Sequence, residues 1–196
     1  MKIFLMRHGE TDYNKRRCFY GSSDVSINAK GKQQALQLRA IMEGIPLCQI
    51  YTSSLRRAKE TADIVFGSNS LSLPELNEKG FGKWEGLMAD EIEAKFPTEW
   101  QAWLKAPFDV TPSQAEKFSH FQQRVWQVTD DLVHRHRTDS IAIVAHLGVL
   151  RLIYQRLIDP QAVFWDLDFP QGTVTCFDNR HSSEWHISIL NRKEES

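Results

Sequence analysis

The sequence predicts an α/β fold, a three-layer α/β/α sandwich around a mostly parallel sheet. Two continuous apolar runs, at residues 3–6 and 141–145, are typical of strands buried on both faces. Helical patterns with one apolar side separate the predicted strands, as expected where strand and helix alternate. We expect a single domain over residues 1–196, with a small helical and loop cap inserted at about residues 79–118 and a C-terminal hairpin.

Charge and cysteine content exclude several classes of protein. A formal net charge of −1 is not typical of nucleic-acid or polybasic membrane binders. Cys18, Cys48 and Cys176 are too widely spaced for a disulfide framework or a zinc motif, which favours a reducing compartment. The apolar start is too short for a signal peptide, and no stretch approaches membrane-spanning length. We therefore expect a cytoplasmic protein that binds no metal, no nucleic acid and no membrane.

The first predicted strand ends abruptly at Arg7, His8 and Gly9. Ligands of open α/β sheets bind beyond the carboxyl ends of the strands. There an arginine can hold an oxyanion through two hydrogen bonds, a histidine can act as nucleophile or acid–base group, and a glycine lets the backbone approach a ligand. A strand-end histidine is more often structural, so this interpretation needs matching residues elsewhere. The basic residues 15–17 indicate either a positive field for an anion or a solvated turn.

Turn residues and hydrophobic periodicity place the remaining elements. In chain order these are a loop at 19–25, a helix at 29–42, a strand at 49–52, a helix at 54–66, a strand at 71–76 broken by Pro74, a helix at 115–137, a strand at 140–146, a helix at 149–157, and a hairpin of 173–178 with 185–190. Asn28 is the predicted N-cap of the first helix, and Ser53 or Ser54 that of the second. His181 is expected in a turn.

Arg56 and Arg57 lie in the first turn of their predicted helix. Cations oppose the helix dipole in that place, because the N-terminal end of a helix favours anions. An arginine that lowers the stability of the helix at this position, but is well placed to bind an anion there, indicates a functional role. An exposed arginine pair on a surface helix is an equally weighted alternative.

A glycine-rich loop at residues 77–86 carries two candidate acids, Glu78 and Glu85. Most loop glutamates are simply solvated. The cap that follows is rich in aromatic side chains, namely Trp100, Trp103, Phe108 and Phe118. These side chains either cover a flat, apolar leaving group or only pack the cap.

The strand at 140–146 repeats the arrangement of the first strand, because its apolar run ends in a histidine, His146. Sheet topology can bring both strand ends, the arginine pair and the acidic loop to one edge. Two arginines and a protonated histidine can neutralise phosphate oxygens while the other histidine attacks phosphorus in line. A carboxylic acid can protonate the leaving alkoxide and later deprotonate water. Such a site needs no metal, since the protein supplies the cations.

The stretch Arg7-His8-Gly9-Glu10-Thr11 resembles the signature of the histidine phosphatase (phosphoglycerate mutase-like) superfamily. Other motifs of the family follow in family order over essentially the whole chain: Asn14, SSLRRAKETA at 53–62, Glu78, FGKWEG at 81–86 and VAH at 144–146. No single motif is specific, but together they are.

The resemblance implies a role for each matching residue. His8 would be the nucleophile that carries the phosphoryl group. Arg7, Arg57 and His146 would bind the phosphate, and Glu78 would be the proton donor. Arg57 is chosen over its neighbour because it stands directly before an alanine, as in the family.

Three further residues are assigned to substrate or phosphate binding by the same resemblance: Asn14, Gly21 and Leu147, the last of which stands where the family usually has glycine. The mechanism also makes a demand on the two histidines. His8 must be neutral to attack, while His146 binds phosphate best when protonated. We therefore expect their environments to push their pKa values apart.

The spacing of Glu78 and His146, 146 − 78 = 68 positions, resembles compact phosphatases more than mutases of the superfamily, which carry a longer insertion. Residues 74–85 are most similar to α-ribazole-5′-phosphate phosphatases of cobalamin assembly. This resemblance implies a metal-independent phosphomonoesterase that acts on a small molecule without a cofactor. A broad-specificity or sugar-phosphate phosphatase is the alternative. A non-catalytic phospholigand-binding module is a third hypothesis, which the intact set of site residues disfavours.

Overall fold

A computed structural model describes residues 1–180, 182 and 184–193. His181, expected in a turn, lies outside these residues. Within the described chain, six strands form one mixed sheet in the order β3-β2-β4-β1-β5-β6. They are β1 (Lys2–Arg7), β2 (Gln49–Thr52), β3 (Leu71–Ser72), β4 (Ser140–Ala145), β5 (Val174–Asp178) and β6 (His186–Arg192). The first four run parallel, and β5 and β6 pair antiparallel, so the predicted sheet and hairpin are confirmed.

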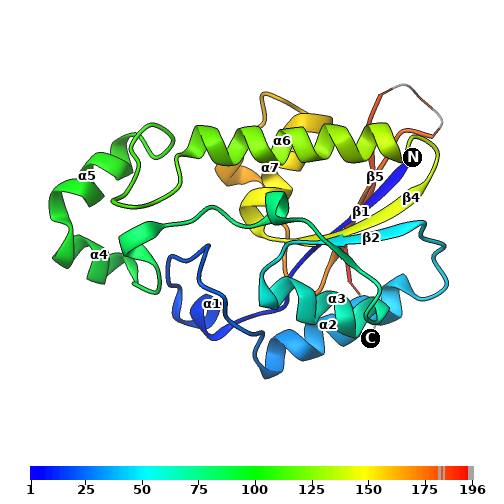
Figure 1. The fold of residues 1–196 in the computed structure, drawn as a ribbon, viewed down its shortest axis with the longest axis horizontal. Coiled ribbons are helices and arrows are strands. Elements are labelled where there is room, and N and C mark those ends of the chain that lie inside the picture. The colour runs from blue at the N-terminus through cyan, green and yellow to red at the C-terminus, as the bar shows by residue number, and fades with distance from the viewer. Residues whose placement is uncertain (181, 183, 194–196) are drawn as a thin grey trace.

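Two helical layers cover the sheet (Figure 1). In the described chain the α-helices are α1 (Asp12–Arg16), α2 (Ala29–Met42), α3 (Arg56–Phe66), α4 (Ala89–Lys95), α5 (Pro97–Lys105), α6 (Phe118–Arg135) and α7 (Leu147–Leu157). Side chains alternate along β1, so that Ile3 and Leu5 pack toward α6 and α7, whereas Phe4 and Met6 pack toward α2 and α3. The predicted three-layer sandwich is therefore confirmed.

Three local predictions were wrong. Neither Ser53 nor Ser54 caps α3, whose N-cap is Leu55 without a side-chain hydrogen bond. Their hydroxyls are used elsewhere, by His146 and Asn77 respectively. The strand predicted at 71–76 is confined to β3, because a 3₁₀ turn begins at the proline. Helix α7 begins two residues earlier than predicted, directly after His146.

The segment at 79–118, which we call the cap, carries α4 and α5 beyond the end of the sheet (Figure 1). Trp84, Ile92 and Trp100 form a small buried cluster of its own. Phe19, from the loop after α1, packs against this cluster and pairs its backbone with Leu87. Phe19 thereby attaches the cap to the loop that follows α1. None of the described helices is both long and apolar enough to cross a bilayer.

Candidate active site

Three parallel strands end at one edge of the sheet and deliver polar side chains there. His8 follows β1, Ser53 follows β2 and His146 follows β4. The strands β1 and β4 are neighbours, and the His8 N–H donates to the Ala145 carbonyl at 2.9 Å. The two imidazole rings lie with their centroids 5.0 Å apart. Sheet topology thus brings together histidines from opposite ends of the chain.

Arg7, the last residue of β1, holds an unpaired cation at this edge. Its Nε atom is buried and has no hydrogen-bond partner in the described part of the chain. Burial lowers the pKa of Arg7, but a guanidinium stays charged in proteins. A buried donor without an acceptor is costly. An oxyanion bound here would supply the missing acceptors.

His8 is held in one tautomer by its backbone neighbour. Its Nδ1 lies 2.8 Å from the Gly9 carbonyl, which can only accept, so Nδ1 carries the proton. Nε2 is then left with a free lone pair. Gly9 itself is needed for packing, because a Cβ there would lie 2.5 Å from the Gly31 carbonyl of α2.

Arg57 and His146 form a buried pair. The Nε–H of Arg57 donates to Nδ1 of His146 at 3.2 Å, so the imidazole proton is on Nε2, which lies 2.7 Å from Ser53 Oγ. The Tyr20 ring lies 4.7 Å from the guanidinium carbon. Arg56, the alternative arginine, instead pairs with Glu60 at the surface.

The remaining bonds of Arg57 go to the loop at 21–23. Its two terminal nitrogens donate to the carbonyls of Gly21 and Ser23, each at 2.7 Å. Three of its five N–H donors are thus used by neutral acceptors, which leaves two for a ligand. The positive charge of Arg57 is not neutralised by these contacts.

Glu85 holds that loop in place. Its carboxylate accepts the backbone N–H groups of Gly21, Ser22, Ser23 and Phe81 at 2.8–3.0 Å. Burial acts to raise the pKa of Glu85, but the bonds from Ser23 and from the backbone hold it below its ordinary value. Glu85 does not line the cavity described below. It positions Arg57 through the loop carbonyls.

Glu78 is fixed at the start of α7. Oε2 accepts the Gly148 N–H and Oε1 accepts the Lys79 N–H, both at 3.0 Å. A Cβ at position 148 would lie 2.5 Å from Oε1, so any larger residue there would displace this carboxylate from its position. The carboxylate is therefore directed to the same strand end as His146.

Arg124 of α6 holds the loop that carries Glu78 through hydrogen bonds. The Arg124 guanidinium donates to the carbonyls of Glu75 and Asn77 at 2.7 Å and pairs with Glu116 at 2.7 Å. Glu116 does not line the cavity either. Arg124 and Glu116 therefore position the loop that carries Glu78, and neither lines the cavity.

The pKa values of both histidines lie well below the ordinary value of 6.5. Burial is the main cause for each, followed by the positive charge of Arg57. The prediction that the two pKa values are pushed apart was therefore wrong for the free site. The charges nearest to both rings are cations, so both imidazoles are neutral at neutral pH.

A cavity of about 290 Å³ opens beside Arg7 and Glu78, and His8, Arg57 and His146 are not among the residues that line it. At the sheet edge it is lined by Arg7, Glu78 and the start of α7, with further cations Arg17, Lys79 and Arg151 on its wall. Burial lowers the pKa of Lys79. The cavity therefore offers an electropositive region beside a carboxylate.

Aromatic side chains line the other part of the cavity, where it meets the cap. Phe108 and Trp165 are stacked with centroids 5.5 Å apart and an interplanar angle of 12°, yet they remain 40% and 48% exposed. Trp103 and Phe118 also line it, as predicted for the cap aromatics, whereas Trp100 lies in the core of the cap. Trp165 comes from the segment between α7 and β5, and no pattern in the sequence indicated it.

The three additional predicted residues differ in placement. Asn14 lines the cavity, and its Oδ1 is occupied by Thr11 and Gln171, so its amide N–H groups remain for a ligand. Leu147 lines the cavity, and its backbone N–H makes no hydrogen bond within the described residues. Gly21 has neither backbone group free, because Glu85 and Arg57 use both. The Gly21 backbone N–H is therefore already used by Glu85, and the predicted role of Gly21 in substrate or phosphate binding stays a prediction.

Ser53 was missed as a site residue. We predicted it to be a helix cap, although it follows β2 directly and the same argument about strand ends applies to it. Tyr20 and Lys79 were also missed. Nothing in their sequence context distinguishes them from ordinary loop residues.

Comparisons with known proteins agree with this geometry. A family model described as histidine phosphatase superfamily (branch 1) matches residues 3–193. An adenosylcobalamin/alpha-ribazole phosphatase of Escherichia coli (strain K12) is 31% identical over 182 residues, 91% of this chain and 90% of that protein. A metal-independent phosphoserine phosphatase of Arabidopsis thaliana is 31% identical over 80% of this chain and 68% of its own. The crystal structure of the alpha-ribazole phosphatase from Shigella flexneri superposes with a TM-score of 0.89 at 29% identity, covering 98% of this chain and 96% of that one.

Proposed function

The chain belongs to the histidine phosphatase superfamily and is a phosphatase, and from this premise we propose that it hydrolyses a small phosphate monoester through a phosphohistidine on His8. One observation carries the proposal. The guanidinium of Arg7, whose Nε atom is buried and has no hydrogen-bond partner in the described chain, adjoins a histidine whose Nε2 is free to attack. A cation without an acceptor beside a neutral nucleophile is the arrangement that an incoming phosphate completes.

In the first step, His8 Nε2 forms a bond to phosphorus as the bond from phosphorus to the ester oxygen breaks. Arg7 and the two free donors of Arg57 bind the equatorial oxygens, which carry the charge of the transition state. Glu78 in its acid form gives its proton to the departing alkoxide. The products of this step are the free alcohol and phospho-His8.

In the second step, the Glu78 carboxylate takes a proton from water. The water oxygen bonds to phosphorus as the phosphorus–nitrogen bond breaks, which releases inorganic phosphate and restores neutral His8. The cations come from the protein, so the scheme uses no metal. A bound phosphate dianion also brings negative charge next to His146 and thereby favours the protonated imidazole, which the free site disfavours.

We place α-ribazole 5′-phosphate first among the substrates. Its ribose phosphate would occupy the region of Arg7 and Glu78, and its flat benzimidazole would lie against the Phe108–Trp165 stack. The resemblance to alpha-ribazole phosphatases over nine-tenths of the chain supports this choice. A second candidate is a smaller phosphomonoester that bears a carboxylate, because Arg17, Lys79 and Arg151 face the same cavity. We also propose a cytoplasmic location, which the free cysteines of the described chain support.

The deciding measurement compares initial rates, in EDTA, on α-ribazole 5′-phosphate, phosphoserine, and a panel of sugar, nucleotide and glycerate phosphates. We expect kcat/KM for α-ribazole 5′-phosphate to be at least ~100-fold above the others, which is about 2.7 kcal/mol of discrimination. Similar rates across the panel would instead indicate a broad-specificity phosphatase.

His8→Ala is the control for the chemistry. We expect kcat to fall by at least about 10³-fold, together with loss of an acid-labile phosphoryl label trapped by rapid quench from radioactive substrate. Phosphate binding should persist in this variant, because both arginines remain. Binding without turnover in the wild-type protein would replace the enzyme by a phospholigand-binding module.

A further inference from the structure

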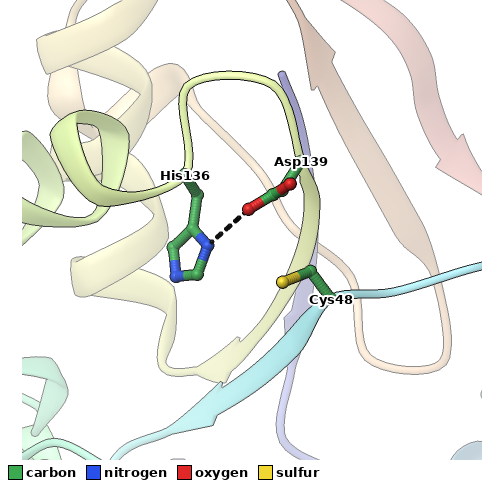
Figure 2. A group of neighbouring side chains, drawn as sticks. All are labelled: Cys48, His136 and Asp139. Atoms are coloured by element: carbon green, nitrogen blue, oxygen red, sulfur yellow. Dashed lines mark hydrogen bonds and ion pairs between the residues drawn. The ribbon is translucent and has the colours of Figure 1, made fainter.

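A second group of reactive side chains lies at the opposite edge of the sheet from the active site. Cys48 directly precedes β2, Asp139 directly precedes β4, and His136 follows the last residue of α6. The thiol sulfur, an imidazole nitrogen and a carboxylate oxygen all lie within 4.8 Å of one another. Figure 2 shows His136 and Asp139 on the turn that leads into β4, with Cys48 beside them at the start of β2. The phosphatase mechanism uses none of them.

We propose that Cys48, His136 and Asp139 bind a divalent cation of the zinc type. A thiolate and an imidazole favour Zn²⁺ over Mg²⁺ or Ca²⁺, which prefer oxygen ligands. Nδ1 of His136 lies 3.1 Å from Oδ2 of Asp139. Two ligands of a tetrahedral zinc ion lie about 3.3–3.7 Å apart, so a small side-chain adjustment opens the space for the ion. Three protein ligands leave the fourth position for water.

The orientation of the imidazole fits metal binding. Nε2 of His136 lies 2.7 Å from the hydroxyl of Tyr51, a fully buried residue of β2. Metal-binding histidines commonly donate their second N–H to an oxygen acceptor, which directs the other nitrogen at the ion, and the Tyr51 hydroxyl oxygen can serve as that acceptor. On binding, the imidazole proton moves from Nδ1 to Nε2, the Tyr51 hydroxyl rotates to accept it, and the Cys48 thiol releases its proton.

The backbone at all three ligands is already fixed. The Cys48 N–H donates to the Ser140 carbonyl at 2.8 Å, the Asp139 N–H donates to the His136 carbonyl at 3.1 Å, and the Lys2 N–H donates to the Asp139 carbonyl at 2.9 Å. Only the side chains of Cys48 and Asp139 need to turn. The bound ion would tie the end of α6 to the starts of β2 and β4, so we assign it a structural role.

A nucleophilic role for Cys48 is a weaker interpretation. Hydrogen bonding to Asp139 raises the pKa of Cys48, so the residue is a thiol at neutral pH until a cation displaces its proton. His136 and Asp139 are three residues apart, but Cys48 lies far from both in the sequence, so no spacing motif indicated a metal. The proposed zinc site replaces the expectation that this protein binds no metal. The proposed phosphatase mechanism still uses no metal.

The test is a cobalt titration of the full chain after treatment with a chelator. We expect the visible bands of tetrahedral Co²⁺, a thiolate-to-cobalt charge-transfer band, and loss of both when Zn²⁺ is added. Cys48→Ser should abolish the charge-transfer band, and Asp139→Asn should weaken binding. Tyr51→Phe should weaken it by about 10–100-fold. Zn²⁺ should raise the Tm of the wild-type protein and leave that of Cys48→Ser unchanged.

Matched controls separate this site from adventitious binding. Cys18→Ser removes another cysteine, and His134→Gln removes an exposed histidine two residues from the site; both variants should keep the wild-type cobalt spectrum. Cys48→Ser should retain full phosphatase activity, since it lies at the far edge of the sheet. Absence of a charge-transfer band in the wild-type protein would overturn the proposal and leave a hydrogen-bonded cluster. Persistence of the band in Cys48→Ser would also overturn it.

Discussion

The active site has two parts that are built in different ways. At the sheet edge, Arg57 and His146 are buried and joined to each other, and the carbonyls and side chains around them are paired before any ligand arrives. Where the cavity meets the cap, Phe108 and Trp165 are stacked but are 40% and 48% exposed. The first part has fixed donors and a fixed charge, whereas the second offers mainly apolar area to a ligand.

This difference separates chemistry from specificity. Fixed donors directed at a phosphate act on any monoester, because they bind the part that all such substrates share. The aromatic part meets only the leaving group, so it discriminates between substrates through apolar contact and stacking. Changes at the sheet edge should therefore affect every substrate, and changes at the aromatic part should affect some of them.

Glu78 is the one proposed catalytic group at the sheet edge whose contribution depends on the leaving group. Its replacement should therefore give the largest difference in rate between substrates. Glu78→Gln should slow the phosphorylation step for an alkyl phosphate by about 10²–10⁴-fold, because an alkoxide needs a proton as it departs. p-Nitrophenyl phosphate should lose far less, since p-nitrophenolate leaves without protonation. The measurement is the pre-steady-state burst on each substrate, which isolates the phosphorylation step from the attack of water.

Glu75→Gln provides the matched control, because this exposed glutamate lies on the same segment and only its backbone carbonyl contacts Arg124. It should leave both bursts unchanged. Equal losses on both substrates in Glu78→Gln would remove Glu78 from the role of proton donor and leave it a positioning group at the start of α7.

Trp165 tests the aromatic part. Trp165→Ala removes one half of the stacked pair, and stacking is worth about 0.5–1.5 kcal/mol beyond buried area. We expect kcat/KM for a substrate with a flat aromatic leaving group to fall by roughly 10-fold. The rate on phosphoserine should change little. Leu104→Ala, at a 51% exposed position of α5 outside the cavity, should alter neither rate. A uniform loss in Trp165→Ala would mean that this side chain shapes the whole site.

The same division explains which parts of the site the sequence could predict. Arg7, His8 and His146 stand at the ends of apolar runs, and parallel strands place such residues at one edge of a sheet, so local pattern and topology were sufficient. Trp165 belongs to an irregular segment whose path depends on tertiary packing, and no periodicity reports it. Ser53 shows an intermediate case, in which the end of the strand was predicted correctly but the partner was not. Its hydroxyl oxygen accepts from His146 and does not accept a backbone N–H from within α3, as an N-cap would.

The protonation of the two histidines could not be predicted from the sequence, because it depends on which charges surround them. His8 and His146 are buried and neutral in the fold, and their pKa values are held below the value of about 6.5 expected in the unfolded chain. As the pH falls below about 6.5, the unfolded state takes up protons that the folded state does not. The free energy of unfolding should therefore decrease on acidification, with a slope of up to about 2.7 kcal/mol per pH unit from the two groups together.

Urea unfolding between about pH 7 and pH 5 measures this slope without interference from carboxylates, whose lowered pKa values, as at Asp178 and Glu10, act at more acidic pH. His8→Asn should reduce the slope by about half, since one neutral imidazole is removed. Inorganic phosphate should also flatten it, because a bound dianion favours the protonated form of His146 and so lets the folded state take up a proton. Stability that is unchanged over this range in the absence of phosphate would mean that both pKa values are the same in the folded and the unfolded chain, which would overturn the prediction. Stability that instead rises on acidification would mean that the fold holds the histidines protonated. In that case His8 could not attack phosphorus, and the proposed mechanism would fail together with the prediction.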